Sequence, residues 1–135
     1  MNESWKVLEE KFGKTYRKGE ILFKEGEMGT HVFFILSGKI RISTTYDQES
    51  GAVHELATLS EGDIFGELAV LDDLPRSATA TALEESRIIV LNREQFYANI
   101  TRYPSLAVRL LKLLGSHIRR LDDKLKRALS LIARS

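Results

Sequence analysis

Residues 65–80, which read FGELAVLDDLPRSATA, hold the side chains of this chain best suited to binding chemistry. Gly66 permits close approach of the backbone to another group. Glu67 only accepts hydrogen bonds when ionised, so a sugar hydroxyl would suit it as a donor. A short helix starting at Glu67 exposes unpaired N–H groups to an anion, and Arg76 adds a planar fork of donors that matches phosphate oxygens. The stretch predicts a site for a sugar and a phosphate.

Each of the two charged residues also has a purely structural interpretation. Glu67 would suit the positive end of a helix dipole, and Arg76 would serve as a solvated loop cation. For Gly66 and Glu67 alone the structural and the binding interpretations are about equally good. The complete ordered string favours binding.

At these residues the chain resembles the phosphate-binding cassette of cyclic nucleotide-binding domains. The resemblance implies that Glu67 holds the ribose 2′-hydroxyl. It also implies that the cyclic phosphate is held by Arg76, Ser77 and the backbone N–H groups of Leu68 and Ala69. The ligand-binding residues expected from it are Phe65, Gly66, Glu67, Leu68, Ala69, Arg76, Ser77 and Ala78. Ser77 directly after Arg76 favours cAMP, with cGMP as the alternative, and no metal is expected.

The composition limits the remaining possibilities. The chain has 135 residues, 43% of them hydrophobic, and no cysteine, which excludes disulfides, thiol catalysis and cysteine metal sites. Residues 1–6 lack the apolar core of a signal peptide. No apolar run approaches the ~20 residues of a membrane span. We expect a soluble, cytoplasmic protein with no membrane partner.

The sequence pattern from Thr15 to Asn92 predicts an antiparallel β-roll. Short apolar runs alternate with glycine-marked turns, which is typical of a sandwich or jelly-roll-like barrel. We expect strands near residues 21–23, 32–36, 40–43, 53–59, 64–65, 78–82 and 88–91. Residues 25–29 and 32–38 resemble the β-roll of the same family, and their glycines are assigned to turn geometry. The expected class is mainly β with helical flanks.

Helices are expected at both ends of the chain. Residues 4–12 place Trp5, Leu8 and Phe12 on one face, with Trp5 as a packing anchor. Asn92 suits the N-cap of a short helix running to about residue 100, with Gln95 at its third position. Pro104 begins a longer helix, so the expected domains are 1–103 and 104–135.

The long helix carries an a/d heptad seam. Its apolar positions step by four and three over more than three heptads, through Ala107, Leu111, Leu114, Ile118, Leu121, Leu125, Ala128 and Ile132. At ~1.5 Å per residue the helix spans roughly 46 Å, longer than a compact chain of this size. We expect a homodimer paired along this seam.

The expected function is that of a cyclic nucleotide sensor that signals through movement of its C-terminal helix. Residues 104–135 hold 8 basic and 2 acidic residues, which we interpret as a solvated helix face. The given sequence holds no segment after this helix that could form a helix-turn-helix domain, so sequence-specific DNA binding is not expected. The chain would be either a stand-alone sensor that acts through an unidentified protein effector or the sensor part of something larger.

Two alternatives belong to other classes of protein. A metal-dependent jelly-roll enzyme needs clustered ligands, whereas His31, His54 and His117 are far apart in the sequence, so an enzyme is not expected. The other alternative is a dimerisation or interaction protein whose cassette does not bind.

Overall fold

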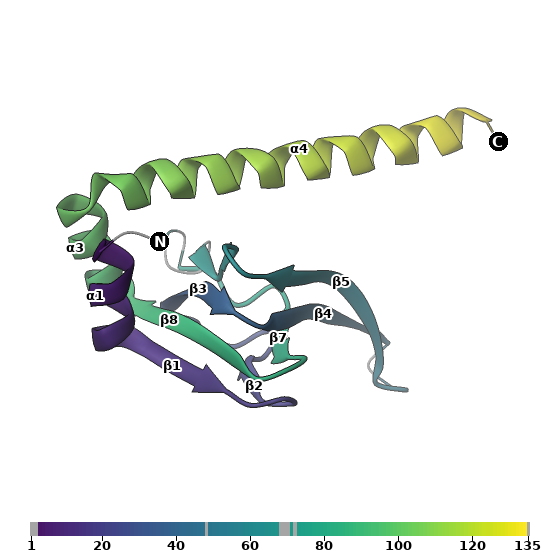
Figure 1. Ribbon diagram of the computed structural model, residues 1–135. Helices are drawn as coiled ribbons and strands as arrows, with labels where there is room; N and C mark the ends of the chain where they lie inside the picture. The colour runs from purple at the N-terminus through teal and green to yellow at the C-terminus, as the bar shows by residue number, and fades with distance from the viewer. Residues whose placement is uncertain (1–2, 48, 68–70, 72, 135) are drawn as a thin grey trace. The chain divides into compact units, whose positions relative to one another are not determined.

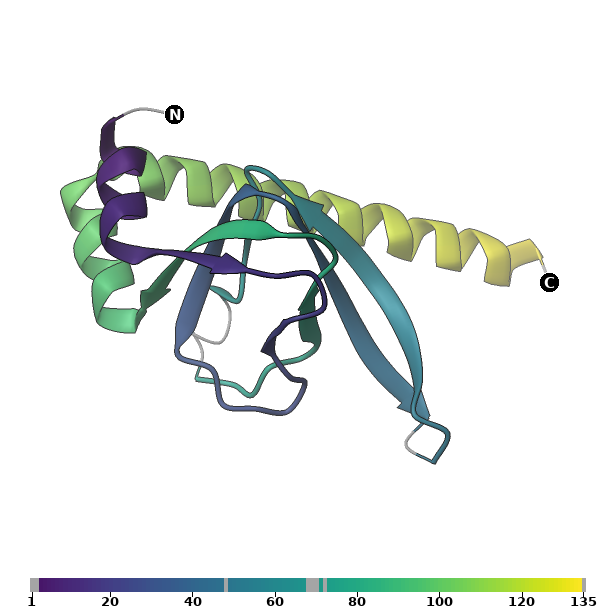
Figure 2. The same ribbon diagram turned by 60° about the horizontal axis from the view of Figure 1, so that its bottom comes forward.

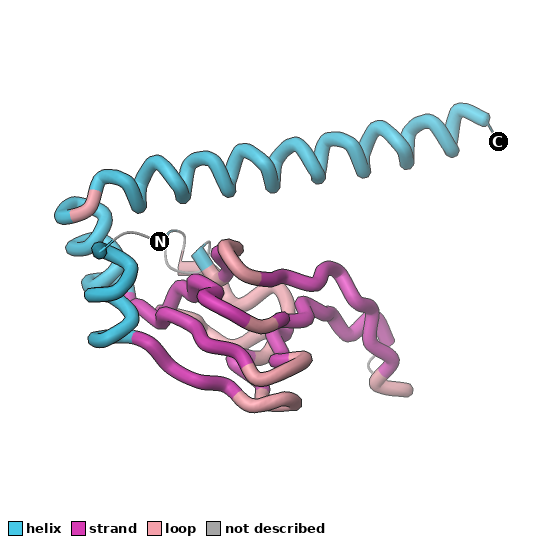
Figure 3. The backbone as a smooth tube through the Cα atoms, viewed as in Figure 1, coloured by secondary structure: helices cyan, strands magenta, loops and turns pink. Residues whose placement is uncertain are grey.

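The computed structural model describes residues 3–47, 49–67, 71 and 73–134. The chain forms two compact units, Met1–Ala98 and Asn99–Ser135, and each is described by itself. Helices occur at the two ends of the chain and the strands lie between them in sequence (Figure 3). Two antiparallel four-stranded sheets, a short N-terminal helix and a long C-terminal helix confirm the predicted fold class (Figure 1).

The first unit holds both sheets. One sheet has the strand order β1-β8-β3-β6 and the other the order β2-β7-β4-β5. The longest hairpin pairs β4 with β5 and is seen clearly in Figure 2. The strands are β1 (Gly13–Tyr16), β2 (Ile21–Phe23), β3 (His31–Ser37), β4 (Lys39–Asp47), β5 (Ala52–Ser60), β6 (Ile64–Phe65), β7 (Thr79–Ala82) and β8 (Ser86–Asn92).

The main core lies between the two sheets. Side chains from the inner face of each sheet form one buried cluster, composed of Tyr16, Phe33, Ile35, Ile40, Leu59, Phe65, Ala80, Ala82 and Ile88. Burying such side chains contributes ~1.5–3 kcal/mol for each large apolar residue. β7 (Thr79–Ala82) contributes Ala80 and Ala82 to this cluster, so the small, weakly apolar run 78–82 forms a strand as predicted.

Strand β3 is buried on both faces, which explains its unbroken apolar run. Phe33 faces the core cluster, whereas Phe34 contacts two aromatic rings from helices. The ring of Trp5 lies edge-on to Phe34 with centroids 5.5 Å apart, and the ring of Phe96 lies 6.5 Å away. Trp5 belongs to α1 (Glu3–Phe12) and Phe96 to α3 (Arg93–Arg102). The predicted anchoring role of Trp5 is confirmed.

A reciprocal capping box starts α3. The backbone N–H of Gln95 donates to Asn92 Oδ1 at 2.8 Å, and the backbone N–H of Asn92 donates to Gln95 Oε1 at 2.9 Å. Two otherwise unpaired donors at the helix start are satisfied in this way. The predicted N-cap at Asn92 is therefore confirmed.

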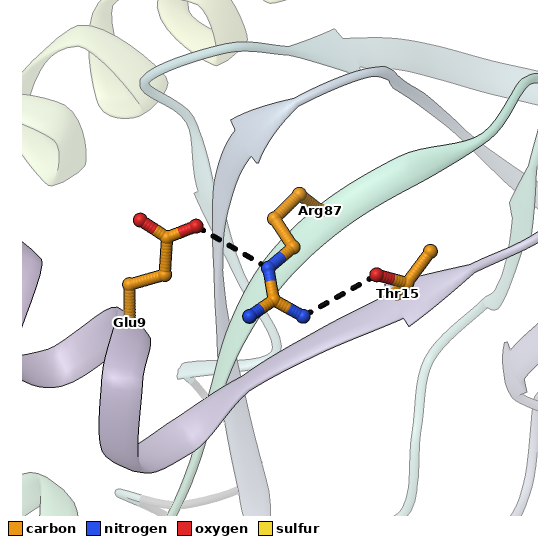
Figure 4. Close-up of polar contacts among 3 residues, drawn as sticks. All are labelled: Glu9, Thr15 and Arg87. Carbon is orange, nitrogen blue, oxygen red and sulfur yellow. Dashed lines mark hydrogen bonds and ion pairs between the residues drawn. The ribbon is translucent and has the colours of Figure 1, made fainter.

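An arginine connects α1 to the first sheet. Arg87 Nε donates to Glu9 Oε1 at 3.3 Å, and Arg87 Nη1 donates to Thr15 Oγ1 at 3.3 Å (Figure 4). Gly13 sits where α1 turns into β1, and a Cβ built on it would lie 2.4 Å from the Glu9 carbonyl oxygen and 2.6 Å from Arg87 Nη2. The absence of a side chain at position 13 is what allows this close approach.

The second unit is dominated by α4 (Pro104–Arg134), a single helix of 31 residues. Pro104 is its first residue, as predicted. Several seam positions are strongly exposed, with exposed fractions between 58% and 69% for Leu111, Ile118, Leu121, Leu125 and Ile132. A Cβ built on Gly115 would meet nothing within 4 Å.

We expect Gly13→Ala to lower the free energy of unfolding by about 1–3 kcal/mol, because the new methyl group collides with backbone that cannot move aside cheaply. The matched control is Gly115→Ala, which should raise helix stability by up to ~1 kcal/mol, since glycine is a poor helix former. Chemical unfolding followed by circular dichroism measures both. Equal effects of the two substitutions would contradict the steric role of position 13.

Candidate functional site

The predicted site begins where β6 ends. Phe65 is buried in the core, and Gly66 follows with a φ of 80°, a left-handed conformation that favours glycine. Glu67 comes next and is only 6% exposed. The predicted contributions of Leu68 and Ala69 lie outside the described residues. The expected glycine turn and acidic residue are thus in place directly after a core strand.

Arg76 is also only 6% exposed, so the chain buries a cation at the other end of the same motif. Burial lowers the pKa of its guanidinium, while the carboxylates of Glu27 and Glu67 oppose that shift. Of the two predicted site residues that follow Arg76, Ser77 is exposed and Ala78 is buried. In the structure, Glu67 therefore lies close enough to Arg76 for its charge to act on the guanidinium, which the motif alone could only suggest.

The guanidinium of Arg76 rests on the main chain. Nη1 donates to the Gly66 carbonyl at 3.0 Å, and Nη2 donates to the His31 carbonyl at 2.7 Å. Within the described part of the chain, the buried Nε has no hydrogen-bond partner. A guanidinium has five N–H donors, so these two bonds leave donor capacity for an anion.

The backbone of Arg76 is fixed by the turn that follows β2. The N–H of Arg76 donates to the Glu27 carbonyl at 2.7 Å, and the N–H of Gly26 donates to the Arg76 carbonyl at 2.8 Å. An isolated bridge between Met28 and Pro75 extends this pairing. A turn some 50 residues away in sequence thus sets where the arginine starts.

The two glycines of that turn have different roles. Gly26 has a φ of 89° and confirms the turn role predicted for it. Gly29 instead makes room for Arg76, because a Cβ built there would lie 1.9 Å from Arg76 Nε. Assigning Gly29 to turn geometry was therefore incomplete, since the space it leaves is filled by a side chain from the cassette.

Glu25 ties the same turn to the second sheet. Its carboxylate accepts from the Thr44 hydroxyl at 2.7 Å and from the Thr45 N–H at 3.0 Å, and its own N–H donates to Thr79 Oγ1 at 2.9 Å. The hydroxyl of Thr44 and then the N–H of Thr45 lower the pKa of Glu25. This carboxylate connects the turn that positions Arg76 to both β4 and β7.

A pocket of about 280 Å³ lies beside Arg76. Of the predicted site residues that the structure describes, only Arg76 lines it. The other lining residues come from β2, the following turn and β3: Leu22, Phe23, Glu27, Met28, Gly29, Thr30, His31 and Phe33. Burial first, and then the charges of Arg76 and Lys14, lower the pKa of His31, so its imidazole tends to remain neutral beside the arginine.

Several residues that shape the site were not singled out as site residues from the sequence. Gly29 and His31 lie against Arg76 although they are 45 or more positions away in the sequence, and the ring centroid of Phe23 lies 4.1 Å from its Cζ. Glu25 acts indirectly, because it fastens the turn whose backbone pairs with Arg76. The resemblance of residues 25–29 to the family pattern marked this segment in the sequence, but it predicted only a turn and no contact with Arg76.

Among the described residues, no group of three or more acidic, histidine or cysteine side chains is placed to hold a metal ion. The same part of the chain has no α-helix with the length and apolar character needed to span a membrane.

Comparison with known proteins identifies the family. The family model of the cyclic nucleotide-binding domain matches residues 13–103. The chain belongs to this family, which confirms the resemblance drawn from residues 65–80.

Individual relatives agree with this assignment. The chain is 36% identical to the cyclic AMP receptor protein of Thermus thermophilus over 112 residues, which is 83% of this chain and 51% of the relative. It is 31% identical to a CRP-like cAMP-activated global transcriptional regulator of Mycobacterium tuberculosis over 110 residues, 82% of this chain and 48% of the relative. The chain thus spans about half the length of the curated relatives it matches.

A solved structure shows the same fold. The crystal structure of the Thermus thermophilus catabolite activator protein matches with a TM-score of 0.78 at 33% identity. The match covers 93% of this chain and 59% of that one.

The hydrogen bonds to Glu25 predict a pH-dependent contribution to stability. Because its pKa lies below the ordinary 4.5 in the folded chain, ionised Glu25 stabilises the fold above its unfolded pKa, and this contribution is lost as the pH falls through the lowered pKa. We expect the wild type to exceed Glu25→Gln in free energy of unfolding at pH 7, with the difference shrinking below pH 4.5.

Urea unfolding across a pH series measures this difference. Thr44→Val serves as the matched variant, because it removes the principal donor and leaves the carboxylate, and it should weaken the pH dependence. A difference between wild type and Glu25→Gln that stays constant from pH 7 to pH 3 would contradict the assignment.

Proposed function

We propose that this chain is a regulatory module that binds a purine cyclic mononucleotide, cAMP in the first place and cGMP as the alternative. The observation that carries the proposal is the buried pair of opposite charges, Glu67 and Arg76, at the two ends of the cassette. A buried cation with donor capacity to spare suits a phosphate, and a buried acceptor suits a sugar hydroxyl. The names of the two relatives above refer to cAMP, which supports the choice of purine.

The roles of the residues follow from this arrangement. Arg76 would bind the cyclic phosphate with N–H groups that the Gly66 and His31 carbonyls do not use. Glu67 would accept a hydrogen bond from the ribose 2′-hydroxyl, and Ser77, which is exposed beside Arg76, would add a hydroxyl to the phosphate. Leu68 and Ala69 would contribute backbone N–H groups, as the family resemblance implies.

The proposed output is a shift in the long helix between two arrangements. A ligand moves such an equilibrium only by its differential affinity for the two states. We propose that α4 passes this shift to a protein effector and pairs with a second copy of the chain. The alternative, an interaction protein with a non-binding cassette, shares the dimer but predicts no nucleotide affinity.

We expect Arg76→Ala to weaken cAMP binding at least tenfold, because a lost charge-assisted hydrogen bond costs ~1.5–3 kcal/mol and tenfold corresponds to ~1.4 kcal/mol. Isothermal titration calorimetry with cAMP and cGMP in parallel measures this. Unchanged affinity in the variant would remove Arg76 from the site. A folded wild-type chain that binds neither nucleotide would exclude the proposed function.

The same titration with 2′-deoxy-cAMP isolates Glu67. If this carboxylate holds the ribose hydroxyl, the deoxy ligand loses affinity for the wild type and much less for Glu67→Ala. Equal losses in both proteins would place the hydroxyl elsewhere.

The exposed seam of α4 predicts a dimer. Leu121→Glu combined with Leu125→Glu should yield a monomer, since paired helices would have to bury both carboxylates. The matched control is Ser116→Glu combined with Ser130→Glu, which adds the same charges on the opposite face of the helix. Sedimentation equilibrium distinguishes the species, and a wild-type chain that stays monomeric at high concentration would refute the pairing.

A further inference from the structure

The aromatic ring beneath Arg76 is the feature of the site that the cassette motif does not contain. Arg76 Cζ lies 4.1 Å from the ring centroid of Phe23 and 5.7 Å from that of Phe33. Both distances fall within the ~6 Å over which a cation is attracted to the face of an aromatic ring. The Phe23 centroid lies 5.5 Å from that of Phe33 and 6.0 Å from that of Phe65, so its ring is braced by two others.

Three kinds of contact together define the orientation of the guanidinium. The ring of Phe23 fixes its plane, and the carbonyls of Gly66 and His31 fix the direction of its two terminal nitrogens. Gly29 limits it on a further side, where a methyl group would already overlap Nε. Because these contacts do not involve the ligand, an anion that reaches Arg76 meets a cation whose position is already set.

We propose that Phe23 is a positioning residue of the nucleotide site, whose ring holds the Arg76 guanidinium in the orientation that receives the cyclic phosphate. The inference rests on the function proposed above and adds a residue from outside the cassette to it. A long, flexible arginine loses much conformational freedom when it binds a ligand, and a group that is already ordered avoids that loss on binding. The ring supplies the order before the ligand arrives.

If the ring instead held Arg76 away from the ligand, removing the ring would release the arginine and tighten nucleotide binding. Nη1 and Nη2 each donate one N–H to a main-chain carbonyl, and the second N–H that each keeps for a ligand argues for a side chain that is ready to bind. The direction of the change in affinity therefore tests the proposal.

Three substitutions separate positioning from general core damage. Phe23→Leu removes the ring and retains an apolar side chain, and Phe23→Tyr retains the ring. Phe34→Leu is the matched control, because it makes the same change in a buried residue that contacts Trp5 and Phe96. Circular dichroism verifies that each variant is folded at the temperature of the titration.

Two measurements are made on each protein. Calorimetric titration with cAMP should show binding about tenfold weaker in Phe23→Leu, within about twofold of wild type in Phe23→Tyr, and little changed in Phe34→Leu. The Nε–H proton of Arg76, assigned by its loss in Arg76→Lys, should resonate upfield in the unliganded wild type, because Cζ, to which Nε is bonded, lies 4.1 Å from the centroid of the Phe23 ring. This upfield position should be lost in Phe23→Leu and kept in Phe34→Leu.

The possible failures are distinguishable. Equal or tighter cAMP binding by Phe23→Leu would overturn the positioning role and leave the proposed function standing. An equal loss in Phe34→Leu, or an Nε–H resonance unaffected by Phe23→Leu, would reduce the ring to ordinary core packing and also overturn the proposal. A folded wild type that binds neither cAMP nor cGMP would remove the proposed function and the inference together.

Discussion

Much of the architecture around the cassette follows from one constraint, the need to hold the charged guanidinium of Arg76 inside a small β domain. At 6% exposure it has lost most of its water, and an isolated buried charge is very costly. The chain offsets this cost with two carbonyl acceptors, an aromatic face and the nearby carboxylates of Glu27 and Glu67. Burying a charged side chain at a cost in stability is typical of functional sites, where the charge must be held in a fixed position.

The parts that surround this arginine come from both sheets. Phe23 ends β2 and His31 begins β3, and the turn between these strands pairs with the backbone of Arg76. Glu25 fastens the same turn to β4 and β7. The cassette supplies the charge, while the β2–β3 connection supplies its geometry. The candidate site is therefore formed by two segments that are distant in the sequence, only one of which carries the motif.

The sequence predicted those features that depend on neighbouring residues. The capping box of Asn92 and Gln95, the turn at Gly26 and the start of α4 at Pro104 each rest on contacts within a few positions. Most strands were recognisable because their apolar runs are short and bounded by glycine, whereas β1 (Gly13–Tyr16) has no apolar run and was not predicted. By contrast, the contacts that orient the Arg76 side chain include residues 45 to 53 positions away. Nothing in the local sequence around Phe23 or Gly29 indicates that these residues contact an arginine. Nothing in the sequence around Gly13 likewise indicates that this glycine provides space for Arg87.

The two hydrogen-bond acceptors of Arg76 belong to the main chain, and this has a consequence for how the site can diversify. No point substitution deletes a backbone carbonyl, so the identity of the residue at position 31 can change while the acceptor persists. These two hydrogen bonds therefore do not depend on which side chains line the pocket, although the carboxylates of Glu27 and Glu67 also act on the cation. Ligand preference can be retuned there, by natural drift or by directed evolution, without dismantling the anchor that every anionic ligand of this pocket would share.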